Sequence, residues 1–498
     1  TIRDELIAHL AYPKIFLRAG RIVELPFTSF SYYPLGLDLL FGMAMSCASD
    51  IAARLLHAGV GILSLWGLYL VARRICGRGS ALWATFFFAQ LPLVVLTGGK
   101  AYVDMGVILY LMGALLAFDD HVRGGGRGAL VRSGIFLGLA FGVKYNALLF
   151  VPVFCFALLW RLARKPPRQA LIEGAALFLP FLLVASPWMI RNLWLTGNPL
   201  FPFYNGIFHG KELMPGLETI PELQFRVETM GWGAQFLIPW LVSVEMTGRE
   251  VYAADGIIGP LFLVFAPFGW FVLRRRPTLL KFLGFVTLGY FVVAWFIGGV
   301  RLRYYLPMLP FCAILAARGW RFFLRVKGIR TLAIVVGGGL IAYNFIVSTT
   351  YLRQADPWPF LLGVQDRESY LLQHLPDYRY MKFMNERLPT DATVMLIHSN
   401  RGYYLDRDYR YDAKFGGYTL KRILRESRSA EEMTCHFRER GISHLYIDLR
   451  GLQTDLGADP LGKDREKMAI LQRFLFGELD ILLQDGRAMI AALPPEKG

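Results

Sequence analysis

The chain has 498 residues, of which 55% are hydrophobic, 14% are aromatic and only 18% are charged; its mean hydropathy is +0.40. This balance is too apolar for a soluble protein of this length and indicates a polytopic membrane protein. The formal net charge of +16 does not indicate a nucleic-acid partner, because Lys and Arg are concentrated in short loops between apolar runs, as positive-inside topology requires.

The first polar segment contains two acids, Asp4 and Glu5, followed by His9. Ionisable groups at a membrane boundary are costly unless they face protein or water, so they predict a functional site. Adjacent helical residues point about 100° apart, so Asp4 and Glu5 cannot both face one substrate atom, and one of them is favoured as the base. Glu5 and His9 are four residues apart and share a helix face. An interfacial helix with an acidic N-terminus is the alternative. Because the sequence begins with Thr1 and no apolar run precedes Asp4, we expect that a signal anchor or first transmembrane helix has been lost upstream.

Long apolar runs predict the transmembrane helices, since about 20 such residues cross a bilayer. Basic loops between the runs mark one side of the membrane, which should be cytoplasmic. With two further helices described next, we expect about ten or more transmembrane helices. The runs are Ile51 to Ala72, Ala81 to Leu96, Ala101 to Phe118, Leu171 to Ile190, Ile257 to Leu273, Thr278 to Ile297, Tyr304 to Ala317 and Thr331 to Thr349.

The segment from Ser133 to Trp160 begins and ends on the cytoplasmic side but is too short for two full spans. We expect a pair of short helices joined by a turn at Gly142 to Asn146, where irregular backbone requires a cavity or protein neighbours. Gly134, Gly138 and Gly142 recur every four residues and would let another helix approach closely. Packing alone is the more economical explanation of these glycines.

This topology brings the remaining polar loops to the outer face, and every candidate catalytic group with them. Asp104 follows Lys100 at the outer end of a helix, where it is either a second catalytic acid or a partner of the helix dipole. Lys144 lies in the buried turn and is a candidate phosphate ligand. Its alternative, snorkelling, requires a nearby interface.

Three arginines, Arg191, Arg301 and Arg303, lie on the outer side against the positive-inside bias. Arginine forks suit phosphate oxygens, so these residues predict an anionic ligand. Acidic lipid headgroups are the alternative partner.

After Tyr351 the composition becomes polar, and we place a domain boundary there: residues 1–355 form a transmembrane catalytic domain, in which 1–50 are a first extracytoplasmic loop with interfacial helices, and 356–498 form a small extracytoplasmic α/β domain. Strands are expected at Thr393 to His398 and His444 to Leu449, with a hairpin around Asp485-Gly486. Helices are expected near Tyr380 to Arg387 and Ala430 to Arg440.

Motifs for several other chemistries are missing from the sequence. It contains no GxxxxGK[ST], HExxH or GxSxG pattern. Its five cysteines are far apart and form no CxxC pair, so neither a zinc cage nor a disulfide framework is indicated.

Taken in order, the polar motifs resemble the bacterial membrane glycosyltransferases of the GT-C fold, the group that includes protein O-mannosyltransferases and the aminoarabinose transferase of lipid A. The resemblance covers most of Thr1 to Tyr351. It is carried by Asp4-Glu5 with Pro13-Lys14 and Gly20-Arg21-Ile22, Ser31-Tyr32-Tyr33-Pro34, Ala101-Tyr102-Val103-Asp104, Gly142-Val143-Lys144-Tyr145, Pro187-Trp188-Met189-Ile190-Arg191-Asn192 with Gly197-Asn198-Pro199, and Arg303-Tyr304-Tyr305-Leu306-Pro307.

The resemblance implies transfer of a sugar from a polyprenyl-phosphate donor, as substrate, to an acceptor hydroxyl outside a bacterial inner membrane. It implies that Asp4 is the base and that Glu5 or Asp104 positions the acceptor or a metal. The donor phosphate would be bound by Lys144, Arg191, Arg301 and Arg303. Further substrate contacts are expected from His9, Lys100, Tyr102, Asn192, Tyr304 and Tyr305.

A divalent metal, Mg or Mn, is possible by the same resemblance, since some GT-C enzymes use one. The expected partners are the bilayer, the lipid-linked sugar and an acceptor lipid, glycan or secreted protein. The competing interpretation is a lipid or solute transporter with charged residues along its pathway, although no inverted repeat is present in the sequence.

Overall fold

A computed structural model of the chain describes residues 4–163, 165–211, 243–244, 257–273, 302–411 and 418–495. The chain divides into two compact units. The membrane unit comprises Thr1–Glu5 and Tyr32–Asp356, and the C-terminal unit comprises Leu6–Ser31 and Pro357–Gly498. The main division thus falls between Asp356 and Pro357. Residues 6–31, which we assigned to the transmembrane domain, instead pack with the C-terminal unit.

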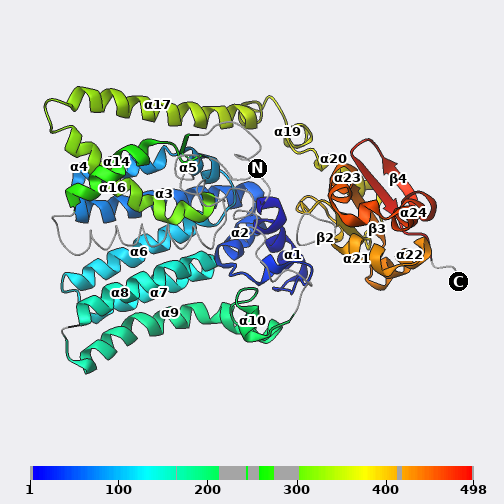
Figure 1. The fold of residues 1–498 in the computed structure, drawn as a ribbon, viewed down its shortest axis with the longest axis horizontal. Coiled ribbons are helices and arrows are strands. Elements are labelled where there is room, and N and C mark those ends of the chain that lie inside the picture. The colour runs from blue at the N-terminus through cyan, green and yellow to red at the C-terminus, as the bar shows by residue number, and fades with distance from the viewer. Residues whose placement is uncertain are drawn as a thin grey trace. The chain divides into compact units, whose positions relative to one another are not determined.

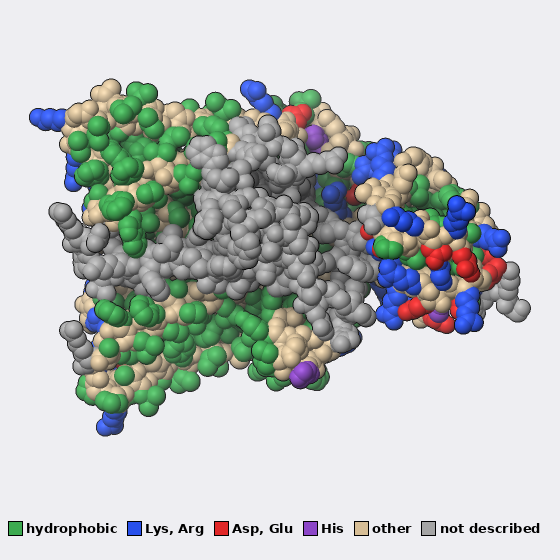
Figure 2. Space-filling view, viewed as in Figure 1, with side chains coloured by type: hydrophobic (Ala, Val, Ile, Leu, Met, Phe, Trp, Pro, Cys, Tyr) green, Lys and Arg blue, Asp and Glu red, His purple; other side chains and the backbone are tan. Residues whose placement is uncertain are grey.

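The membrane unit is a bundle of helices with hydrophobic outer faces (Figures 1 and 2). Neighbouring pairs include α6 with α7, α7 with α9 and α14 with α16. Their bounds are α2 Gly36–Cys47, α3 Asp50–Cys76, α4 Arg78–Ala89, α5 Pro92–Gly98, α6 Asp104–Val122, α7 Gly126–Val143, η3 Tyr145–Phe150, α8 Val151–Leu162, α9 Pro167–Thr196, α10 Asn205–Phe208, α14 Leu261–Leu273, η4 Leu302–Met308, α16 Leu309–Phe323 and α17 Arg330–Ala355.

Six helices in the described part of the chain are long and apolar enough to cross a membrane, or seven if α4 and α5, bent by 67°, form one span. The expected count of ten or more is therefore not confirmed. The run expected at Thr278 to Ile297 lies outside the described residues.

The two helices expected between Ser133 and Trp160 are longer than we anticipated. The helices Gly126–Val143 and Tyr145–Leu162 have 18 residues each, and each is long enough to span. The expectation of short helices is wrong because α7 begins seven residues before Ser133. The turn itself is where we expected it, since Lys144 has extended backbone (φ −161°, ψ 139°) between the two helices.

The glycine repeat of α7 allows close packing against α9. A Cβ atom at Gly134 would lie 2.1 Å from the carbonyl oxygen of Leu177, and one at Gly138 would lie 2.9 Å from that of Phe181. Real Cβ contacts are never this short, so these positions require glycine while the helices stay in contact. The expected close approach of a neighbouring helix is confirmed.

The C-terminal unit contains a five-stranded sheet in the order β2-β1-β3-β5-β4. Strand β1 pairs in parallel with β2 and β3, while β5 pairs antiparallel with β3 and β4. The two strands and the hairpin expected in this region are confirmed, whereas β2 was missed. The strands are β1 Thr393–Ile397, β2 Asp408–Tyr411, β3 His444–Asp448, β4 Asp480–Gln484 and β5 Ala488–Ala492.

Hydrophobic cores lie on both faces of this sheet. One core packs Leu445 and Ile447 of β3 with helices α21 to α24; the other packs Tyr446 of β3 with α20 and Ile7. Alternation along β3 therefore supplies both cores, as expected for a strand covered on two sides. The helices are α1 Ala11–Ala19, α18 Trp358–Leu361, α19 Arg367–His374, α20 Tyr378–Arg387, α21 Tyr418–Glu426, α22 Ala430–Glu439, α23 Leu449–Ala458 and α24 Arg465–Arg473.

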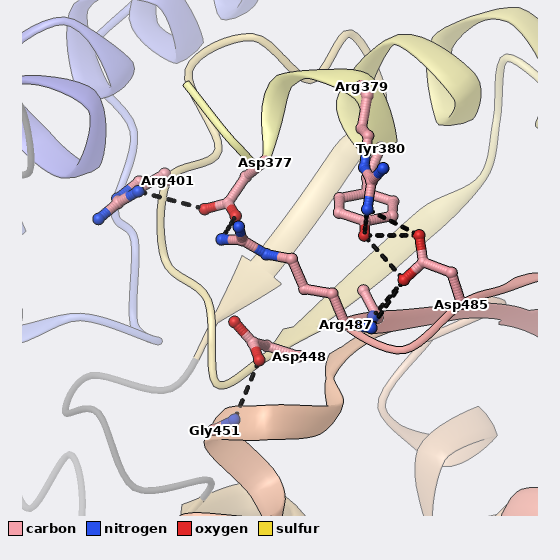
Figure 3. Close-up of polar contacts among 9 residues, drawn as sticks. Asp377, Arg379, Tyr380, Arg401, Asp448, Gly451, Asp485 and Arg487 are labelled. Atoms are coloured by element: carbon pink, nitrogen blue, oxygen red, sulfur yellow. Dashed lines mark hydrogen bonds and ion pairs between the residues drawn. The ribbon is translucent and has the colours of Figure 1, made fainter. Parts of the chain in front are cut away.

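A polar cluster ties α20 to the β4–β5 hairpin (Figure 3). Asp377, just before α20, accepts hydrogen bonds from Arg487 at 2.8 Å and from Arg401 at 3.4 Å. The Tyr380 hydroxyl donates to Asp485 at 2.9 Å, and Asp485 also accepts the backbone amides of Arg487 and Ala488. The turn that the sequence predicts at Asp485-Gly486 is thus held by its own carboxylate.

Candidate functional site

Arg303, at the start of η4, bridges two of the predicted acids. Its guanidinium donates a hydrogen bond to Asp4 and lies 3.8 Å from Oδ2 of Asp104. The Arg303 side chain is buried, and its guanidinium carbon lies 4.3 Å from the ring centroid of Tyr102. A buried guanidinium of this kind requires anionic or aromatic partners, and the site supplies both.

Asp104 joins this arginine to the lysine of the α7–η3 turn. Its side chain is buried in the first turn of α6, where the helix dipole favours an anion. Lys144 Nζ donates to Asp104 Oδ1 at 2.7 Å and lies 5.1 Å from the ring centroid of Tyr304. The extended backbone at Lys144 places this ammonium beside the end of α6.

These contacts form a chain of alternating charge, Asp4, Arg303, Asp104 and Lys144, which we call the charge chain. Its middle members are buried at 4% and 1% side-chain exposure, whereas Asp4 is 30% exposed and Lys144 is 18% exposed. The two accessible ends thus carry opposite charges. One end can accept a proton and the other can bind an anion, while the buried middle holds them in place.

Tyr102 and Lys100 extend the site on the side of Arg303. Lys100 Nζ lies 5.7 Å from the ring centroid of Tyr102, so this ring faces two cations. Both residues lie in the short connection between α5 and α6. Tyr305, next to the Tyr304 that faces Lys144, is buried.

Glu5 belongs to a different ion-pair group from Asp4. Arg54 Nε donates to its Oε1 at 2.5 Å, and Arg54 Nη1 donates to Asp50 Oδ2 at 2.8 Å. Both carboxylates are buried at 1% exposure. The sequence analysis missed Arg54, although its i,i+4 spacing from Asp50 is a visible signal of a pair.

Asn192 organises a third polar group, which is also buried. Its amide nitrogen donates to the Tyr32 carbonyl and to the Tyr145 hydroxyl, each at 2.8 Å. Arg191 lies with its guanidinium carbon 5.9 Å from the ring centroid of Tyr32. Because Tyr145 follows Lys144 directly, this group fixes the backbone next to the charge chain.

His9 ends the π-helix Glu5–His9 and belongs to the C-terminal unit. Arg301 lies outside the described residues.

The acids of the site do not form a cluster suited to a metal ion. Asp4 and Asp104 contact cations, and within the described ranges no three His, Cys, Asp or Glu side chains could together hold a metal. We therefore derive no step through a metal, and the expected Mg or Mn stays a prediction.

Comparisons with known proteins agree on the fold. The family model described as dolichyl-phosphate-mannose-protein mannosyltransferase matches residues 37–190. No curated protein matches the chain in sequence.

Among solved structures, the chain is similar to ArnT from Cupriavidus metallidurans in the apo state, with 13% identity, a TM-score of 0.59 and coverage of 99% of this chain and 94% of that one. It is similar to the same protein bound to undecaprenyl phosphate, with 15% identity, a TM-score of 0.57 and coverage of 99% and 95%. For the Archaeoglobus fulgidus oligosaccharyltransferase tethered with an acceptor peptide, the identity is 13%, the TM-score 0.52 and the coverage 99% and 70%. The resemblance read from the sequence is thereby confirmed, and the chain has the GT-C fold of membrane glycosyltransferases.

Proposed function

We propose that the chain transfers a sugar from a polyprenyl-phosphate donor to an acceptor hydroxyl at the extracytoplasmic face of a bacterial inner membrane. The observation that carries this proposal is the charge chain, with a carboxylate and an ammonium partly exposed at opposite ends. The similarity to a structure bound to undecaprenyl phosphate supports the choice of donor.

In the proposed reaction, Asp4 removes the proton from the acceptor hydroxyl. The acceptor oxygen then bonds to the anomeric carbon as the bond from that carbon to the phosphate oxygen breaks. The proton stays on Asp4, and polyprenyl phosphate leaves with one more negative charge. A positioned general base of this kind typically contributes 10²- to 10⁴-fold in rate.

The charge chain can offset the charge that develops on the leaving phosphate. With two carboxylates, one guanidinium and one ammonium in their usual ionised forms, its formal charge is zero before transfer. Protonation of Asp4 makes it +1 at the moment when the phosphate gains its extra negative charge. Lys144, at the other accessible end, would bind that phosphate. An interaction that strengthens during the reaction lowers the barrier.

The remaining site residues have supporting roles in this proposal. Tyr102 and Tyr304 hold Arg303 and Lys144 through their ring faces, while Arg191 is a second candidate for the donor phosphate. Asn192 holds the side chain of Tyr145 by donating a hydrogen bond to the tyrosine hydroxyl. Glu5 is held by Arg54, so it would shape the acceptor side without serving as the base.

The two ends of α6 support the proposed orientation. Asp104 begins this helix at the site, whereas Asp119 and Asp120 near its other end pair with Arg74 and Arg123. Nineteen residues span about 28 Å, close to the thickness of the hydrocarbon core. In this proposal the basic end of α6 is cytoplasmic, in agreement with the positive-inside rule, and the charge chain is extracytoplasmic.

The test is transfer of radiolabelled sugar from polyprenyl-phosphate donors to membrane extracts by the full-length protein in lipid nanodiscs. We expect Asp4→Asn to lower incorporation about 10²- to 10⁴-fold. Asp120→Asn is the matched control, because it removes an ion-paired aspartate at the opposite end of the bundle. Equal incorporation by Asp4→Asn and the unchanged protein would remove Asp4 from the mechanism. Absence of transfer with every donor, together with lipid or solute movement across vesicles, would favour the transporter.

A further inference from the structure

A short apolar segment follows the last helix of the membrane unit. Residues 357–365 read Pro-Trp-Pro-Phe-Leu-Leu-Gly-Val-Gln and contain no charged side chain. Four large apolar side chains in this segment are exposed: Trp358 by 55%, Leu361 by 65%, Leu362 by 75% and Val364 by 81%. Such a concentration of exposed apolar side chains marks an interaction surface on a protein.

The segment has a fixed shape that presents these side chains together. Helix α18 begins after Pro357, and Gly363 ends the turn with φ +71°. Phe360 faces α19, with its ring centroid 5.7 Å from that of Tyr370. The other four large apolar side chains are mostly exposed among the described residues.

Most backbone N–H groups of the segment are hydrogen-bonded within the segment itself. The amides of residues 361–365 all donate to carbonyls of residues 357–360, at 2.9 to 3.1 Å. Pro357 and Pro359 have no N–H group. Internal hydrogen bonds of this kind lower the cost of moving a backbone out of bulk water into the headgroup layer.

The connection to α17 keeps the segment at the membrane surface. Helix α17 has 26 residues, about 39 Å of helix, which exceeds the ~30 Å hydrocarbon core. Only two residues separate its last residue, Ala355, from Trp358, so the Cα atom of Trp358 lies within roughly 10 Å of that of Ala355. The last three turns of α17 themselves carry exposed apolar side chains, Phe345, Ile346 and Leu352.

We infer that Trp358, Leu361, Leu362 and Val364 insert into the headgroup layer of the leaflet at which α17 ends, and form an interfacial anchor. Tryptophan is enriched at this depth because its ring is apolar and its N–H is polar. Because residues 357–365 carry no charge, insertion depends on apolar contact and not on anionic lipid. This inference does not depend on the proposed catalytic function.

The test measures depth in the full-length protein in nanodiscs. Spin labels are attached at Leu362→Cys, at Val335→Cys within α17, and at Glu466→Cys on the exposed surface of α24, with the five native cysteines replaced by alanine. Collisions with oxygen and with a water-soluble nickel chelate report depth. We expect the accessibility of the label at 362 to the nickel chelate to lie between that of the lipid control at 335 and that of the water control at 466. This accessibility should be the same in zwitterionic and anionic lipid.

A second measurement uses tryptophan fluorescence, in the protein that retains its native cysteines. Trp358→Phe should remove a component of the tryptophan fluorescence that brominated lipid quenches. A label at 362 that is as accessible to nickel as the label at 466 would overturn the anchor. So would protection that appears only when two protein copies share one nanodisc, because the patch would then be an interface between copies.

Discussion

The hydroxyl groups of Tyr12 and Tyr411, 399 positions apart in the chain, share a hydrogen bond of 2.9 Å. Both side chains are fully buried, and Tyr12 also contacts the Thr28 hydroxyl at 3.0 Å. Nearby, Lys14 donates to the carbonyls of Tyr403 and Leu405. Helix α1 is therefore built into the C-terminal unit, although it begins seven residues after the proposed base, Asp4.

Removal of the Tyr12 hydroxyl should destabilise the C-terminal unit. Tyr12→Phe removes a hydrogen-bond partner of the buried Thr28 and Tyr411 hydroxyls. This loss should lower the free energy of unfolding by about 1–3 kcal/mol. Thermal unfolding followed by fluorescence would show the loss as a lower midpoint. Tyr409→Phe, on the same strand as Tyr411, is the control and should cost less. Equal effects of the two substitutions would contradict the importance of the shared hydrogen bond.

Lys14 and Arg18 should make this attachment sensitive to acid through Asp406. Burial raises the pKa of the Asp406 carboxyl, but the hydrogen bonds and charges of Lys14 and Arg18 outweigh it and the pKa is lowered overall. A lowered folded-state pKa gives stability that is present above the unfolded value, about 3.9, and is lost as the pH falls through the folded value. We expect the unfolding midpoint to fall less steeply below about pH 5 in Asp406→Asn. Parallel pH profiles would show that the ion pairs contribute nothing.

The residues of the site that the membrane topology alone brings together could be predicted from the sequence. Asp104 begins α6 and Lys144 directly follows α7, so alternation of the spans places them on one face. Asp4 and Arg303, which are 299 positions apart, were each predicted from a charge at the membrane boundary, and the resemblance implied their roles, but their contact was not predicted. The attachment of α1 to the C-terminal unit could not be predicted, because a pair such as Tyr12 and Tyr411 leaves no periodic signal.

Strand β2 was missed for a related reason. It has only four residues, Asp408–Tyr411, and its two charged side chains make it too polar for a hydrophobic run. The alternation of buried Tyr409 and Tyr411 with exposed Asp408 and Arg410 is the period-2 signal of a strand. Over four residues that signal is too short to distinguish a strand from a loop.

Asp104 should matter for folding as well as for activity. Asp104→Asn removes the buried anion between Arg303 and Lys144, and breaking such a pair costs about 3–5 kcal/mol. Asp120→Asn breaks a half-exposed pair at the other end of α6 and should cost no more than about 1 kcal/mol. Thermal unfolding in detergent would compare the two variants. A smaller loss in Asp104→Asn than in the control would mean that the charge chain is not a buried network.

Lys144 should affect transfer through the leaving phosphate. Lys144→Met keeps the length of the side chain but removes its charge, and loss of one such donor typically lowers kcat about 10²- to 10³-fold. Lys382→Met, which removes a lysine paired with Glu368 in the C-terminal unit, serves as the control. Steady-state transfer assays would separate kcat from KM. A change confined to KM would restrict Lys144 to ground-state binding of the donor.

The glycine repeat of α7 offers a prediction that needs no assay of function. Gly134→Ala would place a methyl group 2.1 Å from the Leu177 carbonyl oxygen, so α7 and α9 must separate. Overpacking of this kind costs about 1–3 kcal/mol. Gly128→Ala lies on the same helix with no heavy atom within 4 Å, and alanine's higher helix propensity should leave stability equal or slightly raised. Thermal unfolding of the two variants in the same detergent gives the comparison, and equal midpoints would mean that α7 and α9 do not pack through this glycine face.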